Sequence, residues 1–148
     1  MPVPDFNASG LLPPGVHVCT LEEAKERFGS FHGSDRRPTL FDSLRALMAD
    51  MQRADLFVAI VLDGSFVTAV AAPNDIDLIL VLRRTHDWNR DPAVREYNVL
   101  SRRRLRRRFK FDAFLAVDGD AGYDEMVAFF GGVRERPDVR KGILRIEL

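Results

Sequence analysis

Two short apolar runs constrain the fold of this chain more than any other feature of its sequence. Residues 56–62 are apolar at every position, and residues 76–82 are apolar except for Asp77. Runs of this length that are rich in β-branched residues are typical of strands buried on both faces of a sheet. We therefore expect both runs to be central strands of a small mixed sheet that is flanked by helices.

The flanking helices are predicted by apolar spacing and by capping patterns. Thr20 and Glu23 form a capping box, which predicts a helix from there to about Phe28. Leucine and methionine residues at helical spacing predict a helix over 39–53, and a shorter one is expected over 122–130. Asp91 followed by Pro92 predicts the start of a further helix, which we expect to continue through residues 102–108.

The remaining segments alternate or break as strands and loops do. Residues 109–117 predict a strand, and the last residues, up to Leu148, alternate as a half-exposed edge strand would. Residues 1–19 are rich in proline and glycine and predict an extended arm. The expected order is α, α, β, β, α, β, α, β, which is a single mixed α/β domain over residues 1–148.

Composition excludes several classes of protein. The single cysteine, Cys19, excludes an internal disulfide framework and is expected to be a small buried apolar residue. No apolar stretch reaches the length of about 18 residues that a membrane span needs, so no membrane partner is expected. The N-terminus lacks the basic and apolar regions of a secretory signal, and we expect a cytoplasmic protein.

The net charge of zero conceals a basic segment. Residues 83–110 carry eleven basic and three acidic side chains, and six arginines lie within 102–108. Such a helix is often only a solvated face, but it can also be a cationic wall that faces a triphosphate or RNA. The candidate polyanion-binding residues are Arg102, Arg103, Arg106 and Arg107. Trp88, in a polar loop, is expected either to stack on a base or to pack as part of a lid.

Three aspartates are candidates for metal binding. Asp75 and Asp77 are two residues apart at a strand start, so strand alternation places them on one face. Adjacent carboxylates resist desolvation unless a cation lies between them, and hard oxygen ligands suit Mg²⁺. If the strand that carries Asp112 lies beside that of Asp77, three carboxylates converge on a site for two Mg²⁺ ions, with Mn²⁺ as a substitute.

The turn that ends the first apolar run is a candidate phosphate-binding element. Gly64 lets a phosphate approach the backbone, and the Ser65 hydroxyl can hold the terminal phosphates of a nucleotide. The strand before the turn would deliver it to the same edge of the sheet as the aspartates.

Together these residues resemble the DNA polymerase β-type nucleotidyltransferase superfamily, especially its minimal members, over about residues 39–117. The superfamily motif is an apolar strand, Gly-Ser, a short link, Asp-apolar-Asp-apolar, and a later strand aspartate. Gly64 and Ser65 match its phosphate-binding turn, and the metal-binding aspartates correspond to Asp75, Asp77 and Asp112. Asp63 departs from the motif, which has an apolar residue there, and must point away or be neutralised.

The resemblance implies a polymerase β-like fold and an Mg²⁺-dependent transfer of a nucleoside monophosphate from a nucleoside triphosphate to an acceptor hydroxyl. The acceptor is left open and includes RNA or the tyrosine or serine of a partner protein. The ends of the chain also resemble uncharacterised bacterial proteins predicted to be nucleotidyltransferase-like. The alternative is an inactive or weakly active relative that binds a partner through the arginine-rich helix, as antitoxins bind toxins. Minimal members of the superfamily often lack a substrate-binding domain, and none is identified in this sequence. A homodimer partner in place of that domain is left open.

Overall fold

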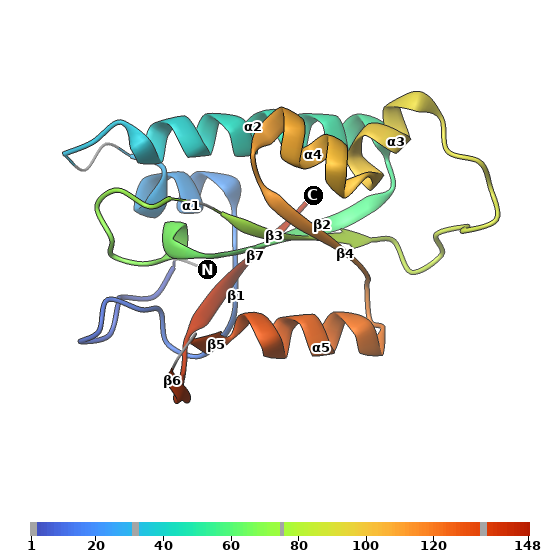
Figure 1. Cartoon of the computed structure of the whole chain (residues 1–148). Helices are drawn as coiled ribbons and strands as arrows, with labels where there is room; N and C mark the ends of the chain where they lie inside the picture. Colours follow the sequence, from blue (N-terminus) through green and yellow to red (C-terminus); the bar gives the residue numbers. More distant parts are fainter. Residues whose placement is uncertain (1–2, 31–32, 75, 134–135) are drawn as a thin grey trace.

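The structure is a computed structural model that describes residues 3–30, 33–74, 76–133 and 136–148. Its centre is a mixed five-stranded sheet in the order β1-β7-β2-β3-β4 (Figure 1). β1 is parallel to β7 and β3 is parallel to β4, whereas β2 is antiparallel to both of its neighbours. The strands comprise Gly15–Cys19 (β1), Phe57–Asp63 (β2), Asp77–Leu82 (β3), Asp112–Val117 (β4) and Gly142–Glu147 (β7).

The two apolar runs form the central strands β2 and β3, as predicted. Alternate side chains of β2 enter two different apolar clusters: Ile60 and Leu62 pack toward the helices on one face, and Ala59 and Val61 toward the other face. This separation follows from the two-residue repeat of a strand. Both faces must therefore be covered, and the mixed α/β class is confirmed.

The two faces of the sheet are covered unequally (Figure 1). One face carries a layer of helices, and the other carries α5 with a small β-hairpin after it. The helical layer comprises α1 (Leu21–Phe28), α2 (Arg36–Ala54), α3 (Val94–Leu100) and α4 (Arg102–Phe109). The second layer comprises α5 (Ala121–Phe130), β5 (Gly132–Val133) and β6 (Arg136–Arg140).

Several local predictions are confirmed. The Thr20 hydroxyl accepts a hydrogen bond from the Glu23 amide, and the Glu23 carboxylate accepts one from the Thr20 amide. α2 ends at Ala54 but begins at Arg36, three residues before the predicted start, with Pro38 in its first turn. Cys19 is buried, as expected.

The long helix predicted from Asp91 through the arginine cluster is wrong. α3 begins at Val94, and the chain is extended at Ser101 before α4 begins. The Ser101 hydroxyl accepts a hydrogen bond from the amide of Arg104 at 3.3 Å and so caps a new helix. A serine side chain that bonds to nearby backbone in this way favours a helix start over a helix interior.

The prediction of an edge strand at the C-terminus is also wrong. β7 lies inside the sheet, because β1 pairs with its outer side from Gly15↔Gly142 to Cys19↔Ile146. The arm predicted over 1–19 therefore ends in a strand. The chain before β1 packs closely against the start of β7, because a Cβ at Gly142 would lie 2.1 Å from the Pro13 carbonyl oxygen. No helix in the described parts of the chain is long and apolar enough to cross a membrane.

Candidate functional site

A row of aspartates crosses three neighbouring strands of the sheet. Asp63 of β2 is paired in register with Asp77 of β3, and Asp77 is paired with Asp112 of β4. Residues in register project from the same face, and these three share their face of the sheet with the apolar residues packed beneath α5. The expectation that the strand of Asp112 lies beside that of Asp77 is confirmed. Asp75 lies outside the described residues.

The Gly64–Ser65 turn ends β2 beside this row. Gly64 has a φ of +89°, which a residue with a Cβ adopts only with strain, and a short 3₁₀ segment, η1 (Ser65–Val67), follows it. The Ser65 hydroxyl accepts a hydrogen bond from the Asn74 amide at 3.2 Å, which ties the turn to the segment that leads into β3. Gly64, Ser65, Asp77 and Lys141 all line one hollow of about 570 Å³.

Two arginines that the sequence analysis did not single out hold this loop in place. The buried Arg37 guanidinium donates hydrogen bonds to the carbonyl oxygens of Phe28, Phe66, Thr68 and Val70. Arg36 donates to the carbonyl oxygens of Pro73 and Asn74. Burial lowers the pKa of Arg37 from its ordinary value.

The predicted helix began at residue 39, so the sequence analysis did not place these arginines at a helix start. Positive side chains in the first turn of a helix oppose the helix dipole, so Arg36 and Arg37 at the start of α2 are locally unfavourable. Their contacts with the loop at residues 66–74 offset that cost. Two adjacent arginines at a helix start thus indicate a tertiary role.

Asp63 is neutralised by a lysine that the sequence analysis also missed. The Lys141 ammonium lies 2.8 Å from an Asp63 carboxylate oxygen, and the two side chains are only 16% and 7% exposed. This pairing removes the conflict raised by a carboxylate directly before Gly64, the predicted phosphate-binding glycine. Lys141 comes from the short link between β6 and β7, and no motif in the sequence marks it.

Asp112 is engaged differently from Asp63. Its carboxylate forms an ion pair with Arg106 of α4, and the Asp112 side chain is 46% exposed. Within the residues that the structure describes, no group of three or more histidine, cysteine, aspartate or glutamate side chains could hold a metal ion. Of the three predicted metal ligands, the structure gives the positions of Asp77 and Asp112.

Most arginines of the cluster contact other residues of the same chain. The guanidinium of Arg102 lies 4.2 Å from the centre of the Phe114 ring, and Arg106 pairs with Asp112. Arg104 and Arg108 likewise contact Asn98 and Asp50. Arg103 and Arg107 make no hydrogen bond, ion pair or ring contact with the described part of the chain, and both are exposed.

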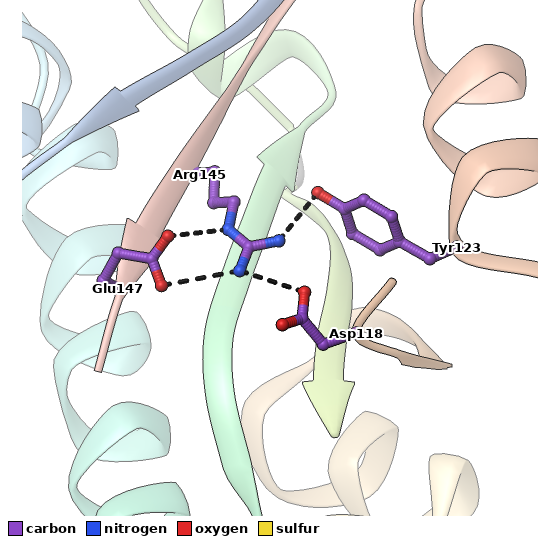
Figure 2. A network of polar contacts seen from close by, with 4 residues as sticks. All are labelled: Asp118, Tyr123, Arg145 and Glu147. Atoms are coloured by element: carbon purple, nitrogen blue, oxygen red, sulfur yellow. Dashed lines mark hydrogen bonds and ion pairs between the residues drawn. The ribbon is translucent and has the colours of Figure 1, made fainter. Parts of the chain in front are cut away.

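Arg145 of β7 ties α5 to the sheet (Figure 2). It is in register with Val61, which packs beneath α5, so it lies on the same face as the aspartates. Its guanidinium donates to the Tyr123 hydroxyl of α5 at 3.0 Å and to Glu147 at 2.9 Å, and it lies 3.3 Å from an Asp118 oxygen. Burial lowers the pKa of Arg145, but the hydrogen bonds to Glu147 and Tyr123 raise it by more, so the net shift is upward. This network fixes the position of α5.

A second hollow, of about 600 Å³, lies between the aspartates and the α5–hairpin layer. Asp77, Val133 and Lys141 line both this hollow and the one at the Gly64–Ser65 turn. The rest of its wall is largely apolar. Its other lining residues are Asp63, Ala128, Phe129, Phe130, Gly132, Pro137 and Arg140.

Trp88 lies at the opposite end of β3 from this site. The loop that carries Trp88 follows Leu82, the last residue of β3, whereas Asp77 is the first. The Trp88 ring packs edge-on against His86, with 4.5 Å between the ring centroids, beside a smaller hollow of about 200 Å³. Figure 1 shows this loop on the side away from η1.

Comparison with known proteins identifies one family that matches almost the whole chain. The chain matches a family of unknown function, DUF6932, over residues 4–147, and it belongs to that family. No curated protein and no solved structure matches it.

Proposed function

We propose that this DUF6932 protein is an Mg²⁺-dependent nucleotidyltransferase. It transfers the nucleoside monophosphate of a nucleoside triphosphate to an acceptor hydroxyl. The acceptor oxygen bonds to the α-phosphorus and loses its proton to solvent, the bond between the α-phosphorus and the oxygen bridging to the β-phosphate breaks, and pyrophosphate leaves with that oxygen. The proposal joins the motif resemblance to the arrangement of the residues that carry it.

The observation that carries the proposal is the register of Asp77 with Asp112. The two carboxylates project from one face of neighbouring parallel strands, and Asp77 lines the same hollow as the Gly64–Ser65 turn. Packing alone does not account for acidic residues in register on neighbouring strands, because like charges repel there.

The donor chemistry of the site fits Mg²⁺. This ion is held by one or two carboxylates together with waters and substrate phosphates, which is what Asp77 and Asp112 can offer. The ion pair of Arg106 with Asp112 does not prevent this, because exposed pairs contribute only about 0–1 kcal/mol and exchange readily. When bound, Mg²⁺ offsets the charge that develops on the phosphate oxygens during transfer.

The remaining residues bind and orient the triphosphate. Gly64 leaves room for the phosphates against the backbone, and the Ser65 hydroxyl is placed to donate to a β- or γ-phosphate oxygen. The Lys141 ammonium adds positive charge at the edge of the same hollow while it remains bonded to Asp63. Arg36 and Arg37 act as positioning residues, since they hold the loop that presents the turn.

The alternative function, partner binding through the arginine-rich helix, has less support. All six arginines are exposed, but four of them make contacts within the molecule, which leaves Arg103 and Arg107 as the two without a contact in the described part of the chain. We treat partner binding as an outcome of the test below.

The test is calorimetric binding of ATP, GTP, CTP and UTP with and without Mg²⁺, followed by an assay of pyrophosphate release. We expect at least one nucleotide to bind only with Mg²⁺, and Asp77→Asn and Asp112→Asn to weaken that binding at least tenfold. Asp42→Asn, an exposed carboxylate of α2 in the opposite layer, is the matched control and should bind normally. Failure of the wild type to bind any of the four nucleotides, or equal binding by Asp77→Asn, refutes the proposal. Salt-sensitive capture of RNA that is lost in Arg103→Glu/Arg107→Glu would then favour the alternative.

A further inference from the structure

The layer formed by α5 and the β5–β6 hairpin encloses the site on the side where the sheet would otherwise be open. The layer follows β4 in the chain and consists of α5, β5 and β6. The hollow it makes adjoins the Gly64–Ser65 hollow, since Asp77, Val133 and Lys141 line both. A nucleoside triphosphate also has two such parts, because a ribose joins its polyanionic phosphates to a flat aromatic base.

Phe129 is the exposed aromatic side chain of this second hollow, and its ring centroid lies 6.2 Å from that of Phe130. It is 79% exposed, whereas its neighbour Phe130 is buried against Phe114 in the core. Adjacent residues of a helix point about 100° apart, so burial of Phe130 does not require an aromatic residue before it. Phe129 nevertheless lines the hollow that contains Asp77 and Lys141.

We propose that the hollow between β3 and the α5–hairpin layer is the nucleobase subsite, and that Phe129 is the ring on which the base stacks. This inference rests on the proposed function, because it assumes that the phosphates occupy the adjoining hollow. The volume of about 600 Å³ lies within the roughly 300–1,000 Å³ of small-ligand pockets, and the apolar wall suits a base. Stacking on one aromatic face is tolerant of base identity, so several nucleotides should bind.

The position of α5 is part of this subsite. Arg145 bonds to Tyr123 on the first turns of the helix, which carries Phe129 at its other end. The Phe129 ring therefore belongs to a helix, α5, that hydrogen bonds hold against the sheet. A preorganised binding residue requires such a rigid support.

The experiment compares Mg²⁺-ATP with Mg²⁺-tripolyphosphate, which has the phosphates but no base, on three proteins. These are the wild type, Phe129→Ala and Trp88→Ala, the last being the matched control for loss of an exposed aromatic residue at the far end of β3. Both substitutions remove exposed side chains, and thermal unfolding checks that the fold is kept. We expect Phe129→Ala to weaken ATP binding about tenfold and to leave tripolyphosphate binding unchanged, and Trp88→Ala to change neither.

The outcomes separate the two proposals. If the wild type binds ATP but Phe129→Ala binds it equally well, or if Trp88→Ala is the variant that loses affinity, the subsite is refuted while the proposed function stands. If Phe129→Ala alters the elution volume on gel filtration but not ATP affinity, the residue belongs to a protein interface and the subsite is again refuted. If the wild type binds neither ligand, the proposed function itself fails.

Discussion

The ion pair of Asp63 with Lys141 gives the sharpest quantitative prediction. The two groups are 2.8 Å apart and almost fully buried, so removal of either one leaves the other as a buried charge without its counter-ion. Loss of one partner of a buried pair typically costs about 3–5 kcal/mol, whereas replacement of both by apolar residues is often nearly neutral. We therefore expect Asp63→Leu and Lys141→Met each to destabilise the fold by roughly that amount, and the double variant to recover most of the loss.

The assay is urea unfolding followed by far-UV circular dichroism on the wild type, the two single variants and the double variant. With a slope of about 2 kcal/mol per molar urea, a loss of about 4 kcal/mol lowers the midpoint by about 2 M. A favourable coupling energy of about 2 kcal/mol or more in this cycle is the expected result. Single variants that each cost under 1 kcal/mol, or losses that simply add, would show that the pair does not neutralise a buried charge and would refute the reasoning.

Two further predictions concern other buried groups. Arg37→Met should destabilise the fold by about 3–5 kcal/mol, because four carbonyl oxygens lose a charged hydrogen-bond donor. The same change should make residues 66–74 sensitive to limited proteolysis. An unchanged midpoint of urea unfolding would contradict the positioning role of Arg37. Burial, with a further contribution from Glu23, raises the pKa of the Cys19 thiol from 9.0 to about 11. The stability that this thiol contributes is complete below pH 9 and is lost as the pH rises toward 11. A disulfide reagent at pH 8 should react slowly with Cys19 in the native protein and rapidly with Cys19 in urea. Fast labelling of the native protein would contradict this prediction.

Local elements could be predicted from the sequence where the determinants are themselves local. The β2 and β3 runs, the Thr20–Glu23 capping box and the Gly64 turn each depend on residues a few positions apart. The failures occurred where a local pattern was compatible with two structures. Nothing in residues 91–109 shows that Ser101 caps a new helix rather than lying inside a long one, because a serine is tolerated in both places.

The candidate site divides in the same way. Gly64, Ser65, Asp77 and Asp112 were predicted from motif spacing, and the structure brings Asp77 and Asp112 into register on neighbouring strands. Lys141, Phe129 and the pair Arg36–Arg37 were missed. They reach the site from elements far away in the chain, and no spacing rule links them to it.

The sequence by itself determined that the runs of β2 and β3 become buried strands and which side chains can carry metal and phosphate chemistry, since hydrophobic periodicity and side-chain functional groups are properties of the chain. Only the tertiary structure decided that β1 covers the outer side of β7, that Lys141 neutralises Asp63, and that α5 closes the aspartate face. These facts depend on pairings between distant segments. Their free energy comes from burial and charge compensation that exist only once the sheet has assembled.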